Sequence, residues 1–458
     1  MTTAMLTSTN PFTGEKISEH LALQGEQISA QIGIAAAAFP LWSSKSFAER
    51  GKVLHAVAAQ LRKHKGRLAE LMALEMGKPV KEGGPEVEKA ATCCEYYAEH
   101  ASKHLADEWI ASDASESYVK YQPLGTLLGI LPWNAPAWLA FRYLAPALMA
   151  GNTCVMKHDP NVPATAQALA DLFKEAGAPA GVVVNLPLRT EHVEEQAIRD
   201  PRIMAVSFTG SSAAGRKVAA TAASELKPAV LELGGSDPCI VLADADLERA
   251  ADVVVLSRII NAGQSCIAAK RILIEAKIYE EFTTLLKVRL AKLRMGNPLD
   301  YTTDIGPIAR KDLRDNLHRQ VQQSLEQGAK CLLGGEIPDA PGYHYPPTLL
   351  ADVQPGMCAF EEETFGPVMA VMPIENIDEA LAVANNTNYG LGSSIWTASI
   401  SKALRAVHEL QAGQVAVNGI VKTDPRLPSG GIKQSGYGRE LGPHGIREFV
   451  NAKQVWIK

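Results

Sequence analysis

A cysteine and a carboxylate, each in a short run of small or apolar residues, are the strongest candidates for chemistry in this sequence. Cys266 ends residues 261–266 (NAGQSC), and Glu232 lies between two leucines in residues 231–235 (LELGG). A thiol attacks as the thiolate, and with an ordinary pKa of about 8.5 only a few per cent is ionised at neutral pH. A nearby base would therefore help such a nucleophile. An isolated cysteine would instead be interpreted as a small buried hydrophobe.

Four further motifs accompany this pair in a fixed order along the chain: residues 132–134 (PWN), 207–211 (SFTGS), 362–367 (EETFGP) and 430–436 (GGIKQSG). With the motifs at Glu232 and Cys266, the ordered set resembles the NAD(P)-dependent aldehyde dehydrogenase superfamily over nearly the whole chain. Within that superfamily, the sequence is most similar to bacterial succinate-semialdehyde dehydrogenases. Six ordered motifs are far more specific than any one of them.

The resemblance implies a chemical role for three residues. The Cys266 thiolate would add to an aldehyde carbonyl, and the side-chain amide of Asn134 with the Cys266 N–H would stabilise the alkoxide formed. Hydride transfer to nicotinamide would leave a thioester on Cys266, and Glu232 would act as general base for its hydrolysis. Burial among leucines should raise the pKa of Glu232. The simpler alternatives are that Asn134 shapes a turn before Pro136 and that Glu232 forms a structural ion pair.

A cofactor site is expected from the resemblance rather than from the usual fingerprint, because no Gly-x-Gly-x-x-Gly follows a strand. Glycine at the start of a helix permits close approach of a pyrophosphate to backbone amides. The resemblance places Glu363 on the nicotinamide ribose and Phe365 near the nicotinamide ring; without Phe365 and the residues after it, residues 361–363 would be interpreted as an exposed acidic run. The residues expected around the adenosine and pyrophosphate half are Trp133, Lys157, Gly210 and Ser211.

A departure from the family pattern after Lys157 bears on the choice between NAD and NADP, and the sequence favours NAD with NADP as the alternative. Many relatives carry Lys-Pro-x-Glu, with the glutamate on the adenosine ribose, whereas this chain has Lys157, His158, Asp159 and Pro160. Pro160 removes one barrier to a 2′-phosphate. Asp159 would repel that phosphate if it pointed inward.

Substrate selection is expected to involve arginine. Arg142 lies in an otherwise apolar predicted helix, about 80° around the helix from Asn134. A buried guanidinium requires an anionic partner, either the carboxylate of succinate semialdehyde, as the resemblance implies, or a structural carboxylate. Some relatives carry a second arginine where this chain has Ile260, and Arg426 is a possible substitute. Ser429 replaces a usual phenylalanine at the expected pocket mouth.

Composition limits the function to small-molecule chemistry. The net charge of −5 with interspersed signs gives no basic stripe for nucleic acid. The seven cysteines lack metal-binding spacing, so no metal is expected and a reducing, cytoplasmic location is the simpler interpretation. Neither a signal peptide nor a membrane span is predicted.

The 458 residues predict an α/β protein with two or three domains. Short apolar runs alternate with helical patterns, which favours doubly wound parallel sheets that bind ligands at their carboxyl ends. Helices are expected at 46–76, from 85 to about 103, at 136–149, from 163 to 177 and from 190 onward. We expect a Rossmann-type cofactor domain (1–112 and 131–233), a catalytic domain (234–425) and a β arm (113–130 and 440–458), which the resemblance implies forms a homodimer or homotetramer.

The sequence therefore predicts NAD- or NADP-dependent oxidation of an aldehyde, with succinate semialdehyde as the expected substrate and another aliphatic or aromatic aldehyde as the alternative. Two rivals remain. A thiol hydrolase would use Cys266 without redox chemistry, and a non-catalytic nucleotide-binding protein would keep only the fold. The first would need a histidine partner for Cys266, and no histidine lies near the cysteine motif.

Overall fold

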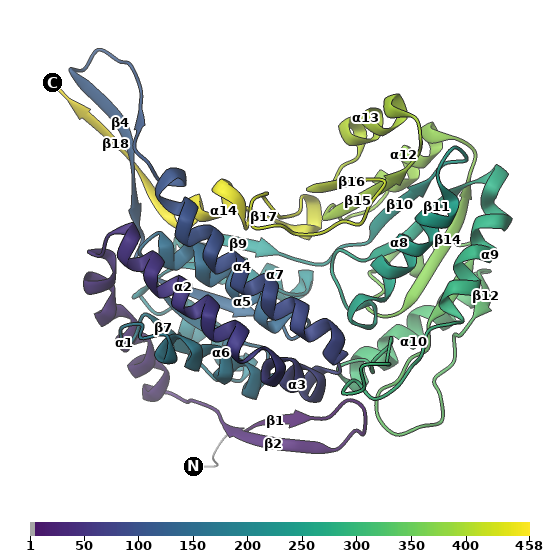
Figure 1. The fold of residues 1–458 in the computed structure, drawn as a ribbon, viewed down its shortest axis with the longest axis horizontal. Helices are drawn as coiled ribbons and strands as arrows, with labels where there is room; N and C mark the ends of the chain where they lie inside the picture. The colour runs from purple at the N-terminus through teal and green to yellow at the C-terminus, as the bar shows by residue number, and fades with distance from the viewer. Residues whose placement is uncertain (1–4) are drawn as a thin grey trace.

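Two largely parallel β-sheets form the two lobes of the protein, and a narrow β arm projects from the first lobe (Figure 1). The computed structural model describes residues 5–458. Strand β9 ends at Glu232 in the first sheet, and β10 begins at Asp237 in the second. A short segment thus carries the chain between the lobes. This arrangement confirms the expected α/β class.

The first sheet has six strands in the order β17-β9-β8-β5-β6-β7, parallel except for β17. Every residue of β5 and β6 is buried, which explains why both strands are apolar runs rather than alternating ones. Strands β6 and β7 lie on one side of β5, whereas β8 and β9 lie on its other side. The crevice between β5 and β8 is therefore a topological switch point, where such sheets bind ligands. The strands are β5 (Thr126–Leu131), β6 (Thr153–His158), β7 (Val183–Asn185), β8 (Ile203–Thr209), β9 (Ala229–Glu232) and β17 (Gly436–Tyr437).

Helices cover both faces of this sheet. The core on one face is built largely from α2 to α6, and the core on the other from α1, α7 and the sheet. The helices are α1 (Glu26–Ser43), α2 (Phe47–Lys63), α3 (Lys65–Met76), α4 (Val80–His104), α5 (Pro136–Met149), α6 (Pro163–Glu175), α7 (Ser212–Ser224) and α14 (Gly442–Arg447).

The second sheet has seven strands in the order β12-β13-β14-β11-β10-β15-β16, parallel except for β12. Its strands are β10 (Asp237–Val241), β11 (Ala269–Glu275), β12 (Lys330–Leu333), β13 (Thr348–Ala351), β14 (Val368–Ile374), β15 (Gly392–Trp396) and β16 (Gln414–Val417). Its helices are α8 (Leu247–Ile259), α9 (Tyr279–Leu290), α10 (Lys311–Glu326), α11 (Cys358–Glu361), α12 (Ile377–Asn385) and α13 (Ile400–Glu409).

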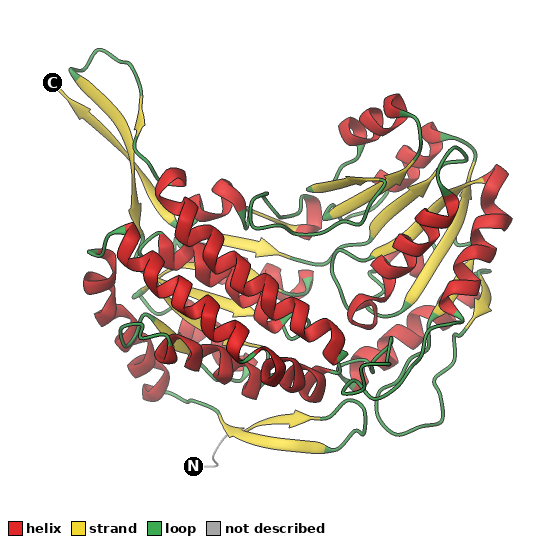
Figure 2. Cartoon of the chain, in the orientation of Figure 1, coloured by secondary structure: helices red, strands yellow, loops and turns green. Residues whose placement is uncertain are grey.

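Two small antiparallel sheets lie outside the lobes (Figure 2). Strands β1 (Met5–Thr9) and β2 (Lys16–Leu21) form a hairpin near the N-terminus. The arm consists of β3 (Glu108–Trp109), β4 (Glu116–Pro123) and β18 (Val450–Ile457), with β4 in the middle. Strand β5, which falls within the range 113–130 expected for the arm, is instead a central strand of the six-stranded sheet.

Three predicted helices differ from those observed. The helix expected at 46–76 is broken at His64 (φ −97°, ψ 10°) into α2 and α3. Helix α4 begins at Val80, five residues before the predicted start, and keeps Pro85 in its second turn. The helix expected from Thr190 is a single 3₁₀ turn (Thr190–His192) followed by a π-helical turn (Glu194–Ile198).

The described helices differ in length or apolar character from a membrane-spanning helix. Within residues 5–458, no helix combines the length and apolar character needed to cross a bilayer.

Candidate active site

A cavity of about 420 Å³ contains the three residues for which the sequence predicts catalytic roles. Cys266 and the loop before it come from the second lobe. Asn134 and Glu232 come from the first, where they follow the carboxyl ends of β5 and β9. The fold therefore brings together side chains that are separated by up to 132 positions in the sequence, from 134 to 266.

The loop that carries Cys266 has an unusual backbone. Three consecutive residues after α8 are left-handed: Asn261 (φ 57°), Ala262 (φ 53°) and Gly263 (φ 74°). A Cβ on Gly263 would lie 2.3 Å from the carbonyl oxygen of Gly366, so this position requires glycine for space as well as for conformation. Non-glycine residues in this region persist only where surrounding contacts hold them.

Side-chain amides supply those contacts and join the loop to Asn134. The Asn134 Nδ2 donates to the Gln264 carbonyl at 3.1 Å, and the Asn261 Nδ2 donates to the Asn134 carbonyl at 2.8 Å. The Gln264 side chain donates to the Asn261 carbonyl at 3.0 Å and accepts from the Ala309 N–H at 2.9 Å. Asn134 is thus fixed beside the cysteine, where its amide can face a reacting carbonyl group.

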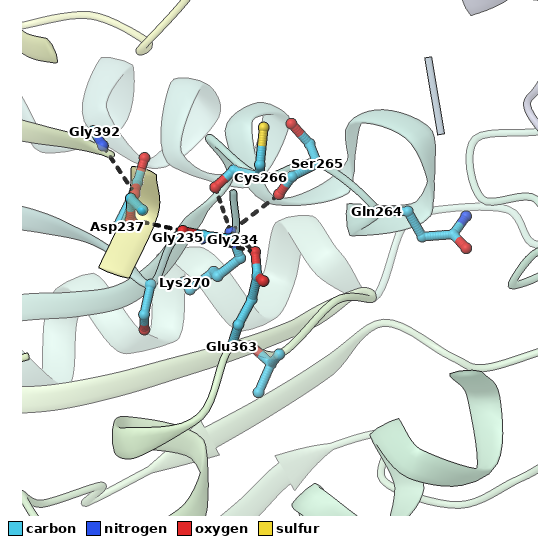
Figure 3. Close-up of polar contacts among 12 residues, drawn as sticks. Gly234, Gly235, Asp237, Gln264, Ser265, Cys266, Lys270, Glu363 and Gly392 are labelled. Carbon is cyan, nitrogen blue, oxygen red and sulfur yellow. Dashed lines mark hydrogen bonds and ion pairs between the residues drawn. The ribbon is translucent and has the colours of Figure 1, made fainter. Parts of the chain in front are cut away.

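A buried lysine lies on the other side of the cysteine loop. The Lys270 ammonium donates to the Ser265 and Cys266 carbonyls at 3.0 and 2.7 Å and pairs with Glu363 at 3.2 Å (Figure 3). Glu363 also accepts from the Gly235 N–H at 3.1 Å. The sequence analysis missed Lys270. A detectable signal was a pair of basic residues, Lys270 and Arg271, at the start of a strand in which every residue is buried.

The thiol of Cys266 is protonated in this arrangement. Burial raises the pKa of Cys266 to about 12, while the positive charges of Lys270 and Arg142 oppose this increase. The side chain is nevertheless partly exposed, because it opens onto the cavity.

Glu232 is buried at the end of β9 and belongs to a cluster of three charged groups. One nitrogen of the Arg142 guanidinium lies 3.3 Å from Glu232 and 2.5 Å from Glu440, and it also donates to the Ser429 hydroxyl at 3.3 Å. Burial raises the pKa of Glu232 to about 7, Arg142 opposes the rise, and Glu440 adds to it. Arg142 therefore has structural carboxylate partners as well as a place in the cavity lining.

Glu440 was not singled out by the sequence analysis, although it follows shortly after the motif at 430–436. It is almost completely buried, and one of its oxygens lies 3.4 Å from the Ser207 hydroxyl. Its partners come from elements distant in sequence, so only the fold reveals its relation to Glu232.

The residues expected to bind cofactor lie at the carboxyl edge of the first sheet and at the facing loop of the second lobe. Gly210 and Ser211 precede α7, and the Ser211 hydroxyl caps that helix by accepting from the Ala214 N–H at 3.3 Å. The rings of Trp133 and Phe365 meet edge to face with centroids 5.8 Å apart.

Lys157 supplies a test of whether this edge fits an anionic cofactor. It is buried at the end of β6, and burial lowers its pKa while Asp159 and Glu191 oppose that effect. Within residues 5–458 its ammonium group has neither an ion pair nor a hydrogen bond. A buried cation without a protein partner, at the same edge of the sheet as the N-terminus of α7, fits a group rich in hydroxyl and phosphate oxygens.

Ile260 and Arg426 differ in whether their side chains reach the cavity. Ile260 lines the cavity, as expected for a position that replaces an arginine. Arg426 is not among the described residues that line it: its side chain is 75% exposed and pairs with Asp424 at 2.7 Å. The structure therefore does not bring Arg426 together with Arg142.

Known proteins with similar sequences match nearly the whole chain. Residues 2–455 match the model of the aldehyde dehydrogenase family. A probable succinate-semialdehyde dehydrogenase (NADP+) of Synechocystis sp. is 45% identical over 448 residues, 98% of each chain. The succinate-semialdehyde dehydrogenase (NADP+) 1 of Mycobacterium tuberculosis is 45% identical over 451 residues, also 98% of each.

A solved structure shows the same fold. The succinic semialdehyde dehydrogenase of Streptococcus pyogenes, in complex with NADP+, superposes with a TM-score of 0.96 at 34% identity and covers 98% of this chain and 99% of its own. The sequence motifs, the two-lobed fold and these relatives agree, and the chain belongs to the aldehyde dehydrogenase family.

Proposed function

We propose that this protein oxidises an aldehyde to a carboxylic acid, with NAD or NADP as the hydride acceptor. One observation carries the proposal: Cys266, Asn134 and Glu232 line a single cavity, and the loop of Cys266 is joined through Lys270 to Glu363. The fold thereby holds four groups together: a nucleophile, an oxyanion donor, a buried base and the expected cofactor contact.

Covalent catalysis would begin at Cys266. The thiol gives its proton to solvent water, the sulfur forms a bond to the aldehyde carbon, and the carbonyl oxygen becomes an alkoxide near the Asn134 amide. When bound, the oxidised nicotinamide supplies the acceptor for the hydride that leaves this carbon. The carbonyl re-forms as the hydride departs, and a thioester remains on Cys266.

Hydrolysis of the thioester would depend on Glu232. Its carboxylate takes a proton from water as the water oxygen attacks the acyl carbon, and the Cys266 thiolate leaves. With a pKa of about 7, Glu232 is available as a base near neutral pH. The cluster with Arg142 and Glu440 holds its orientation.

Succinate semialdehyde is the substrate we propose. The relatives named above carry that activity in their names, and Arg142 and Ser429 line the cavity together with apolar residues such as Trp138 and Leu139. The competing thiol-hydrolase hypothesis is disfavoured because no histidine is found among the described residues of the cavity lining.

For the cofactor, we propose that NADP is accepted at least as well as NAD. The Asp159 carboxylate accepts from the Asn161 N–H at 2.9 Å and lies 3.8 Å from Arg310, so its negative charge is partly offset. Pro160 offers no carboxylate to repel a 2′-phosphate. The relatives named above are also described as NADP+ enzymes.

The test is the initial rate of reduced-cofactor formation with each of the two cofactors, using succinate semialdehyde and butanal. We expect higher kcat/KM for succinate semialdehyde, and no rate with Cys266→Ala. Equal kcat/KM for the two aldehydes would contradict the substrate, and no reduction with either cofactor across an aldehyde panel would contradict the oxidoreductase activity.

A further inference from the structure

We propose that Lys89 binds the carboxylate of the aldehyde substrate and so selects negatively charged aldehydes. The proposal rests on the proposed function and adds a residue to it. Lys89 belongs to α4, and its side chain lines the same cavity as Cys266. It also lines a second, more open cavity of about 780 Å³ beside the first, so it lies where the substrate cavity meets the outside.

The charge of Arg142 is already engaged within the protein. Its guanidinium faces two buried carboxylates, Glu232 and Glu440. One cation against two acids gives a net charge of −1 when both are ionised, and zero when they share one proton. Arg142 and Ser429 can orient a substrate carboxylate by hydrogen bonding, but the cluster offers it no excess positive charge.

Most other cations of the cavity lining are also neutralised. Lys78 pairs with Glu86, and Lys81 pairs with Asp304. Lys422 has no ion pair among the described residues, but it is exposed to water, where a charge attracts weakly. Lys89 is half-buried, and within residues 5–458 no carboxylate oxygen lies within 4 Å of its ammonium group.

The contacts of Lys89 hold its ammonium at the cavity wall without neutralising it. The nitrogen donates to the Thr423 hydroxyl at 2.6 Å and lies 4.1 Å from the centre of a Trp138 ring. Neither partner is an anion. A partly desolvated ammonium attracts an incoming carboxylate more strongly than an exposed one does, because less water screens the charge.

Lys89 and Arg142 line the same cavity, and the charge of Arg142 acts on Lys89. Burial and, to a smaller extent, repulsion by Arg142 lower the pKa of Lys89 to about 8, against the opposing effects of Glu86, Cys93 and Asp424. Two of these acids are themselves occupied, since Glu86 pairs with Lys78 and Asp424 pairs with Arg426. Because Glu232 and Glu440 already offset the charge of Arg142, the charge left to attract an anion in this space is that of Lys89.

The experiment compares kcat/KM for succinate semialdehyde with kcat/KM for butanal in the intact enzyme. Lys89→Met keeps the length of the side chain and removes its charge, so the ratio of the two constants should fall about 10-fold or more, mainly through KM for the charged aldehyde. Lys89→Arg should restore most of the ratio. Lys422→Met, which removes an exposed charge at the same cavity, should change the ratio less than threefold.

The pH dependence gives a second readout. Because the protonated ammonium binds the carboxylate, KM for succinate semialdehyde relative to KM for butanal should be constant below about pH 8 and rise above it, and this rise should disappear in Lys89→Met. An unaltered substrate ratio in Lys89→Met, with the rise retained, would overturn the proposal. If the wild-type enzyme itself showed no preference for succinate semialdehyde over butanal, the failure would lie in the proposed substrate instead.

Discussion

Glu232 shows how burial and charge act in opposite directions on one residue. Burial among apolar neighbours raises its pKa to about 7, while Arg142 at 3.3 Å favours the ionised form. A carboxyl group can accept a proton from water only when it is ionised. The proposed base is therefore inactive below its pKa and active above it.

The first prediction concerns this titration. Where deacylation limits turnover, kcat should rise about tenfold per pH unit on the acid side and level off above about pH 7, since each unit changes the ionised fraction tenfold. Glu232→Gln should lower kcat and remove this dependence. A wild-type plateau extending below pH 5, or an unchanged profile in Glu232→Gln, would contradict the assignment.

The second prediction concerns the ionisation of the Cys266 thiol. Burial raises the pKa of this thiol to about 12, so the free enzyme contains very little thiolate at neutral pH. The rate of alkylation of Cys266 by iodoacetamide should therefore keep rising with pH up to at least pH 9, about tenfold per unit. The site of alkylation is confirmed by peptide mass spectrometry. A plateau near pH 7 would show that the thiol is already ionised in the free enzyme.

Sequence motifs predicted which residues meet in the cavity, but not the charges around them. Cys266, Glu232 and Asn134 are recognisable because each sits in a distinctive short motif. Lys270 and Glu440 act through partners brought close only by folding. Arg426 was a plausible second cation by its place in the chain, yet its neighbour Asp424 holds it at the surface.

At the scale of the element, the turn after α8 determines where Cys266 points. Its three left-handed residues are tied to Asn134 and Gln264, and Gly263 packs directly against the Gly366 backbone. Strands and helices elsewhere were predicted well because buried parallel strands leave short apolar runs and amphipathic helices leave a helical repeat of apolar residues. The break at His64 and the π-helical turn at Glu194–Ile198 have no such pattern, since packing decides them.

Gly263→Ala provides the third prediction. The added methyl group would clash with the Gly366 carbonyl and displace the loop, and a displacement of about 1 Å can cost about 100-fold in rate. We expect kcat to fall strongly and the melting temperature to decrease. Gly177→Ala is a matched control, because Gly177 has nearly the same φ (75°) and nothing within 4 Å of an added Cβ.

The Gly177→Ala control separates the effect of backbone strain from the effect of the steric clash with Gly366. Both variants incur the cost of a left-handed alanine, about 1 to 2 kcal/mol. Only Gly263→Ala should lose activity. Equal loss of activity in both variants, or none in either, would show that the position of the loop does not depend on this contact.

In the molecule as a whole, the three strands of the β arm pair with no other strand among residues 5–458. It projects from the first lobe, and β18 forms one edge of its three-stranded sheet (Figure 1). Several large apolar side chains on or beside the arm are exposed, including Trp109 (65%) and Trp456 (45%). Small sheets with an open edge and exposed apolar groups are stabilised by pairing with another chain.

The fourth prediction is that the protein forms a homo-oligomer through this arm. Light scattering coupled to size-exclusion chromatography should give a mass that is a multiple of the 49.1 kDa chain. Trp456→Asp should increase the monomer fraction, whereas Leu226→Asp, at a 93% exposed position outside the arm, should not. A wild-type mass of 49.1 kDa at micromolar concentration would contradict the prediction.

In the proposed mechanism, both lobes act on one carbon atom attached to Cys266. The most direct measurement is a rapid acid quench of Glu232→Gln with NADP and succinate semialdehyde, followed by peptide mass spectrometry and quantification of reduced cofactor. We expect a succinyl group on the Cys266 peptide and about one reduced cofactor per active site before turnover slows. Reduced cofactor without acylation of Cys266, or acylation of a different residue, would contradict it.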